Sequence, residues 1–188
     1  MMLVSPAPWI PITYRHSRKS RASAGTRLLE SPGEVLALLD LDDGRLQTSA
    51  DRRIFLTRTA GRGRTLSNYE EIEALLHEWS FETVDTDGMS LREQAQLFRE
   101  CRYVIGIHGA GLTNIIHAYD HDLSLLQLRQ PGEEHLITDF AQMCHSFGFA
   151  HQEIFGTSEH GHRNASFRID VAVLRAAIER MLIPPPSD

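Results

Sequence analysis

The sequence predicts an α/β fold: a Rossmann-like, mainly parallel sheet with helices on both faces. Short apolar segments alternate at least four times with longer segments whose apolar residues recur at helical spacing. The short segments are apolar throughout, which is typical of parallel strands buried on both sides. Several helical segments also follow a serine with glutamate three residues later, a common signal for the start of a helix.

The strand segments are recognised by their length and by flanking turn residues. The segment at 103–107 is the most apolar, and we expect it at the centre of the sheet, paired in parallel with its neighbours. The predicted strands span residues 54–57, 81–84, 103–107, 123–128 and 152–155.

The helical segments are recognised by their apolar faces and their end signals. Capping boxes are predicted at Ser31–Glu34, Ser67–Glu70 and Ser90–Glu93, and Asp170 is a further N-cap. Gly148 is predicted to end one helix as its C-cap. The predicted helices span residues 35–39, 72–79, 91–98, 112–118, 136–147 and 171–181.

Composition narrows the class of protein. The 188 residues suit one domain, which we place at 51–183, after an N-terminal arm with a short helix at 1–50 and before a tail at 184–188. A net charge of −6 argues against a nucleic-acid partner. No apolar run reaches the length of a transmembrane helix, and the start lacks the features of a signal peptide. We therefore expect a cytoplasmic protein whose two cysteines, Cys101 and Cys144, stay reduced and unpaired.

The run from Tyr103 to Asn114 predicts an anion site. An apolar strand ends at His108, passes Gly109 and Gly111, and opens into a predicted helix. Backbone N–H groups at a helix N-terminus attract anions, and glycines let a phosphate approach and allow positive φ. The carboxyl end of a parallel strand is also where open α/β sheets bind ligands.

Other charged residues follow the other strands at the same predicted edge. Arginine binds phosphate with bidentate geometry, so the loop after the first strand is a second candidate phosphate site. Taken alone, however, its arginines are better interpreted as solvated loop charges. The charged residues at this edge are Arg58, Arg62 and Arg64 after the first strand, Asp85 and Asp87 after the second, and Arg129, Glu133 and Glu134 after the fourth.

Several alternative motifs do not fit. The glycines lack both the dinucleotide-binding spacing and the lysine of a Walker A loop. His117 and His121 are spaced like metal ligands, but spacing places no third ligand beside them. We therefore interpret both as surface histidines and expect no metal and no resident cofactor.

The chain resembles glycosyltransferase family 61 over about residues 52–150. The resemblance rests on Arg53–Arg58, Arg64, Asn68–Glu71, Phe81–Val84, the Gln94-x-x-Leu97-Phe98 element and Val104–Asn114 with its His-Gly-Ala-Gly-Leu core. It implies the C-terminal, donor-binding half of a GT-B-like enzyme that uses a nucleotide sugar, inverts the anomeric carbon and needs no metal. The family includes capsular-polysaccharide-type transferases and plant and animal xylosyl-, arabinosyl- and N-acetylglucosaminyltransferases.

The resemblance also implies site residues. The donor-side positions would be Arg58, Arg64, Gln94 and the segment His108, Gly109, Ala110, Gly111, Leu112 and Thr113, of which His108–Leu112 would face the diphosphate. The catalytic base is unassigned, with His108, Asp85 and Asp87 as candidates. One departure is the next strand, where the family often has valine–glutamate–leucine and this chain has Leu126-Gln127-Leu128.

Two hypotheses of different class follow. In the first, the chain is the donor-binding half of a glycosyltransferase acting on a glycan or other hydroxyl acceptor. Residues 1–50 are too few for a second Rossmann half, so a missing N-terminal half or a partner chain would hold the acceptor. In the second, the chain is a non-catalytic nucleotide-binding or interaction domain derived from such an enzyme. A different α/β enzyme acting on phosphorylated metabolites is a third alternative.

Overall fold

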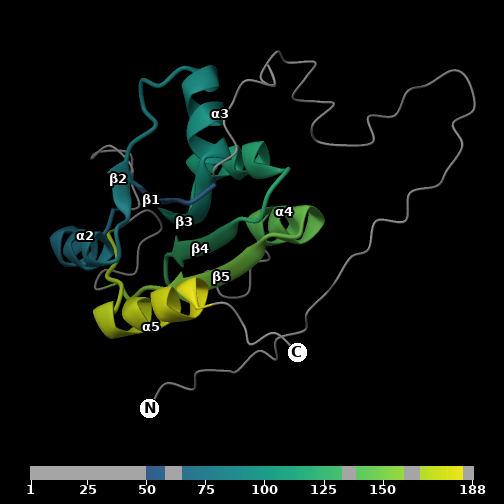
Figure 1. Ribbon diagram of the computed structural model, residues 1–188. Coiled ribbons are helices and arrows are strands. Elements are labelled where there is room, and N and C mark those ends of the chain that lie inside the picture. The colour runs from purple at the N-terminus through teal and green to yellow at the C-terminus, as the bar shows by residue number, and fades with distance from the viewer. Residues whose placement is uncertain (1–49, 58–64, 133–138, 159–165, 184–188) are drawn as a thin grey trace, which may run out of the picture.

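The described part of the chain forms a parallel sheet covered on both faces (Figure 1). This computed structural model describes residues 50–57, 65–132, 139–158 and 166–183. All four neighbouring strand pairs are parallel, and the central strand is the one predicted. The strands are β1 (Arg52–Leu56), β2 (Glu82–Val84), β3 (Cys101–Ile107), β4 (Ser124–Arg129) and β5 (Ala150–Phe155), in the order β2-β1-β3-β4-β5.

Two apolar clusters bury the two faces of the sheet. Helices α2 (Tyr69–Glu78) and α5 (Val171–Leu182) pack on one face, against side chains such as Ile105 and Leu126. Helices α3 (Leu91–Arg99), η1 (Ala110–Ala118) and α4 (Asp139–Phe147) pack on the other, against Val104 and Leu125. Adjacent residues of β3 and β4 thus serve opposite clusters, as the two-residue period of a strand requires. The predicted α/β fold is confirmed.

The helix ends follow the predicted signals in part. Ser90 and Glu93 form the expected capping box, and Asp170 accepts hydrogen bonds from the first amides of α5. The predicted capping box at Ser67–Glu70 is wrong. Helix α2 begins after Asn68, whose side chain exchanges hydrogen bonds with the backbone of Ile169, at 2.9 and 3.2 Å, instead of capping its own helix.

Two details of the helices also differ from expectation. The segment after β3 is a 3₁₀ helix rather than an α-helix. Leu91 is the first apolar residue of the predicted helix at 91–98, yet it is 67% exposed, whereas Leu97 is buried. The predicted helix at 35–39, the arm, the tail and Leu136 lie outside the described residues.

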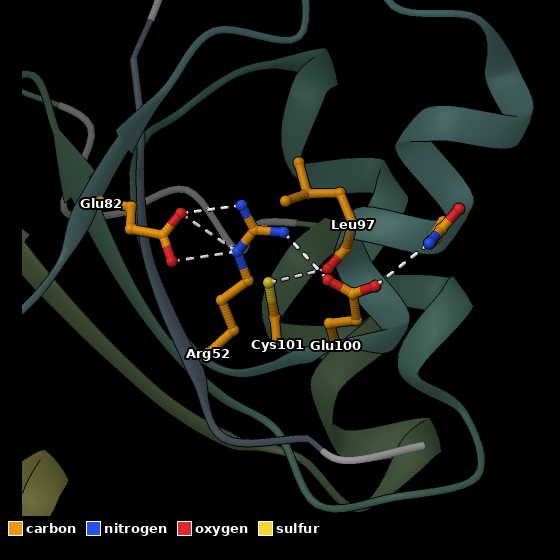
Figure 2. A network of polar contacts seen from close by, with 6 residues as sticks. Arg52, Glu82, Leu97, Glu100 and Cys101 are labelled. Atoms are coloured by element: carbon orange, nitrogen blue, oxygen red, sulfur yellow. Dashed lines mark hydrogen bonds and ion pairs between the residues drawn. The ribbon is translucent and has the colours of Figure 1, made fainter. Parts of the chain in front are cut away.

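An ionic cluster joins the amino ends of three strands (Figure 2). Arg52 at the start of β1 donates to Glu82 at the start of β2, at 2.7 Å, and to Glu100 just before β3, at 2.9 Å. Beside it, the Cys101 thiol donates to the Leu97 carbonyl at 3.1 Å. These contacts fasten α3 and the edge strand β2 to the centre of the sheet at one end.

Candidate functional site

The strand order makes the carboxyl ends of β1 and β3 the expected place for a ligand crevice. From β1 the chain moves outward to β2, then returns to β3 and continues through β4 to β5. Helix α2 follows β1 onto one face, and η1 follows β3 onto the other. Loops that leave adjacent strands toward opposite faces open a crevice outside the carboxyl ends, which is the usual ligand site of open parallel sheets. Leu56 of β1 pairs with Gly106 of β3 at this point.

The predicted anion turn lies at this crevice. The His108 amide still donates to Leu128, at 2.9 Å, and so extends the pairing of β3 with β4. Gly109 then has an extended backbone, and the first bond of η1 runs from the Leu112 amide to the Gly109 carbonyl, at 3.0 Å. The amides that precede this bond, those of Gly109, Ala110 and Gly111, have no carbonyl within the helix to donate to. The turn therefore retains the chemistry of an anion site although its helix is 3₁₀.

Gly111 of this turn serves packing. Gly111 does not have positive φ, and among the described glycines only Gly88, Gly132 and Gly148 do. A Cβ on Gly111 would lie 3.2 Å from Leu56 Cδ2 and 3.9 Å from Thr86 Oγ1. The positive φ that glycine allows is therefore not used at Gly111, and the missing side chain of Gly111 lets η1 lie close to β1.

His108 has a partner in the neighbouring strand. Its Nδ1 accepts a short hydrogen bond from the side-chain amide of Gln127 in β4, and its ring packs edge-on against Phe140 of α4, 5.5 Å between centroids. The Gln127 carbonyl oxygen lies 3.2 Å from His151 Nε2 in β5. Gln127 is fully buried, so a single carboxamide holds two imidazoles in place.

A partly buried ion pair continues this row toward the end of the sheet. Arg129 of β4 is 2% exposed and donates to Glu153 of β5 at 3.0 Å, with its guanidinium over the Phe155 ring. Glu153 also lies 3.7 Å from His151 Nε2. Burial lowers the pKa of His151, and the Arg129 charge lowers it further, although Glu153 raises it. Arg129 was expected in the loop after the fourth strand, and it lies instead inside β4.

Gln94 joins elements around the turn. Its carbonyl oxygen accepts from Asn114 of η1 at 2.8 Å, and its amide donates to the Met89 carbonyl at 3.0 Å. Asn114 also donates to Gly111 at 3.2 Å. The Gln94 side chain therefore connects α3, η1 and the loop after β2. In the structure both of its polar atoms bond to other residues of the chain, Asn114 and Met89.

The two candidate carboxylates lie after the edge strand. Asp85 accepts from the Asp87 amide at 2.9 Å, so it shapes its own loop. The intervening Thr86 approaches Gly111, which brings this loop against the start of η1. Strands lie about 4.8 Å apart, so the end of β2 is on the order of 10 Å from that of β3.

Other predicted residues fall elsewhere. Arg58, Arg62, Arg64, Glu133 and Glu134 lie outside the described residues, although Arg58 directly follows Thr57 at the end of β1. Ala110 and Thr113 are exposed on η1, whereas Leu112 is buried. The interpretation of His117 as a surface histidine is wrong, because its side chain is buried. His121 bonds to Asp120 and to the Cys101 carbonyl.

Sequence reasoning missed Gln127, His151 and Glu153. The available signal was the polar residue at the centre of the apolar strand Leu126-Gln127-Leu128, which was noted only as a missing carboxylate. A polar group inside a strand buried on both faces requires a partner there.

A second hollow lies along β2 and α3, with a volume of about 510 Å³. Carboxylates of Asp85, Glu82, Glu93 and Glu100 line it, and its one arginine, Arg52, already pairs with two of them (Figure 2). Negative walls disfavour a phosphate. The crevice at β1 and β3 is therefore the better candidate for an anionic ligand.

A parallel sheet with helices on both faces and a strand-to-helix turn at its switch in strand order defines a Rossmann-like α/β protein. The model of one family, glycosyltransferase 61, matches residues 10–122, and the chain belongs to this family. The match includes Gln94 and the His108–Thr113 turn, and it ends before β4. No curated protein matches the chain. Among the described residues, no helix has the length and apolarity needed to cross a membrane.

Proposed function

We propose that this chain binds a nucleotide-sugar donor at the carboxyl ends of β1 and β3 and acts in transfer of the sugar to a hydroxyl acceptor. The observation that carries the proposal is the turn His108–Leu112 at the switch in strand order, in a chain of glycosyltransferase family 61. Its leading amides offer fixed donors to a diphosphate, and His108 adds a ring held in place by Gln127.

The same groups suit the chemistry of transfer. When an acceptor hydroxyl attacks the anomeric carbon with inversion, the nucleoside diphosphate leaves and its oxygens gain charge. Fixed N–H donors aimed at these oxygens stabilise the transition state more than the ground state. Arg58 and Arg64 would add cations, and Asp85 or Asp87 would accept the hydroxyl proton. A cytoplasmic location, independence of metal, a role in capsular polysaccharide synthesis and an acceptor-binding half outside this domain belong to the same proposal.

The central test adds a negative charge at the turn. Ala110 is exposed in the first turn of η1, so Ala110→Asp should fold normally. It should weaken UDP or GDP binding roughly ten- to a hundredfold, because like charges brought together cost on the order of 1.4–3 kcal/mol or more. Isothermal titration calorimetry measures this, with circular dichroism to confirm folding.

The matched control is Ala172→Asp, which adds the same charge to the exposed first turn of α5 on the opposite face. The control should bind like wild type. Equal affinity of wild type and Ala110→Asp would contradict the proposed site. Gly111→Val is less informative, because its side chain would clash with Leu56 whether or not a ligand is present.

A second prediction concerns Arg58. Arg58→Ala removes a charge-assisted hydrogen bond to phosphate, worth roughly 1.5–3 kcal/mol, so affinity should fall about ten- to a hundredfold. Arg175→Ala is the control, because Arg175 pairs with Glu78 at 2.9 Å on the face of α2 and α5. If both variants bind alike, the first-strand loop does not contribute.

The alternative of a non-catalytic domain predicts binding without chemistry. Slow hydrolysis of a nucleotide sugar by this chain would favour an enzyme. Nucleotide binding without hydrolysis, together with no transfer to a panel of hydroxyl acceptors, would favour the non-catalytic domain.

A further inference from the structure

Gln127 occupies an unusual place for a neutral amide. It lies in β4 with its side chain fully buried, between His108 after β3 and His151 in β5. It faces the same side of the sheet as Leu125, two residues earlier, which belongs to the apolar cluster under α3, η1 and α4. A buried amide in such a place must make hydrogen bonds, and both of its polar atoms do.

The direction of these bonds follows from the orientation of the Gln127 amide in this structure. The Gln127 side-chain nitrogen carries two protons and only donates, so His108 Nδ1 must accept. The proton of a neutral His108 is then on Nε2. The Gln127 oxygen only accepts, so His151 donates to it through Nε2–H. One orientation of the amide thus selects the tautomers of both histidines.

We propose that Gln127 is a positioning residue that keeps the His108 proton on Nε2, so that a neutral imidazole meets the diphosphate as a hydrogen-bond donor. The choice of ligand rests on the proposed function, whereas the tautomer does not. Glutamate at this position would accept from both facing nitrogens and would favour two charged imidazolium rings. Glutamine therefore selects a neutral donor where glutamate would select a cation.

An ion pair and an aromatic ring flank this row of polar side chains. The charged side chains that face this row from β4 and β5 are Arg129 and Glu153, which pair with each other at 3.0 Å. From α4 the contact to His108 is the apolar ring of Phe140.

The first experiment is NMR of uniformly ¹⁵N-labelled protein, with two-bond ¹H–¹⁵N correlations of the histidine rings. These correlations distinguish Nε2–H, Nδ1–H and imidazolium forms. We expect wild-type His108 in the Nε2–H form when neutral. Gln127→Glu should shift it to a form protonated on Nδ1 and raise its titration midpoint by about 1–3 pH units. Gln127→Met, which has a similar volume and cannot hydrogen-bond in this way, should give a mixture of neutral tautomers.

Leu126→Met is the control, because it changes the adjacent residue of β4 on the opposite face and should leave both histidines unchanged. A wild-type His108 protonated on Nδ1 would overturn the inference, and this reading needs no variant to fold. An unchanged tautomer in a folded Gln127→Met protein would overturn it equally.

The second experiment is UDP and GDP titration of the same proteins across pH. In Gln127→Glu, affinity should gain a pH dependence that tracks the His108 titration seen by NMR. If the nucleotide affinity of Gln127→Glu does not change as His108 titrates, the His108 ring does not contact the diphosphate. Absence of nucleotide binding by wild type would count against the proposed function, while the NMR result would still decide the role of Gln127.

Discussion

At the scale of single residues, buried polar groups explain most of what is specific to this chain. Asn68 joins α2 to the backbone before α5, and Gln127 joins two histidines across three strands. His117 is different. It is 5% exposed, and its Nδ1 has no hydrogen-bond partner within the described ranges. Burial lowers the pKa of His117, and the nearby Arg99 charge lowers it further.

This lowered pKa predicts a dependence of stability on pH. Below the ordinary histidine pKa of 6.5, the unfolded chain takes up a proton that folded His117 resists. The unfolded state then binds more protons, so the free energy of unfolding should fall as pH falls from 6.5 toward the folded pKa, and level off below it. Above 6.5 neither state is protonated, and this contribution vanishes. Burial of His151 acts in the same direction.

Urea unfolding at a series of pH values between about 5.5 and 7.5 measures the effect. His117→Asn should give a flatter profile than wild type. His145→Asn is the control, because His145 is exposed on α4, and its profile should match that of wild type. A steep profile that persists in His117→Asn would assign the effect to other groups.

At the scale of elements, the ends of helices decide which sequence signals succeed. Ser90 and Glu93 satisfy each other's backbone amides because nothing else competes for them. At the start of α2, the competing partner is the Ile169 backbone, which lies about a hundred residues away in sequence and takes the Asn68 side chain. Local patterns predict caps that are local, and they fail where a distant segment offers a better bond.

The Ser90 cap has a measurable contribution. Ser90→Ala removes the acceptor for the Glu93 amide and one half of the capping box, so the protein should lose about 1 kcal/mol of stability. Chemical denaturation measures the loss. Ser146→Ala serves as the control, because Ser146 is an exposed residue within α4 that caps nothing, and its effect should lie within about 0.5 kcal/mol. Equal effects would mean that the box contributes no more than a surface hydroxyl.

At the scale of the whole molecule, periodicity was enough to predict the parallel sheet, and tertiary pairing was needed to build the site. Five apolar segments and their capped helices follow from local pattern. Strand order does not, and it is the return of the chain to pair β3 with β1 that locates the crevice. Likewise, register brings Gln127 beside His108, 19 residues earlier, and no local spacing encodes that pairing. The sequence also does not distinguish a 3₁₀ helix from an α-helix at η1, because both kinds of helix place apolar residues three or four positions apart.

The two cysteines report on the cooperativity of this sheet. Cys101 and Cys144 are both free, as predicted, and both belong to the cluster under α3, η1 and α4. Burial raises the pKa of each thiol to about 12, so neither forms a thiolate at neutral pH. Since both are enclosed in one core, they should react with a disulfide reagent only when the domain opens as a whole.

Ellman's reagent in native buffer and in guanidinium measures this. Neither thiol should react in native buffer, and both should react at once in guanidinium. At intermediate denaturant the two thiols should react at equal rates. Fast labelling of one cysteine alone under native conditions would show that α4 or α3 opens independently.

The ionic cluster at Arg52 also bears on how such a protein can change. Its bonds join residues 30 and 48 positions apart, and they lie at the strand starts, at the opposite end of the sheet from the carboxyl-end turn. The loops at the carboxyl ends can therefore gain, lose or exchange residues without disturbing the contacts that hold β2 and α3 to the sheet. A designer who wishes to alter the proposed donor site can graft new loops after β1 and β3 and leave the opposite end as it is.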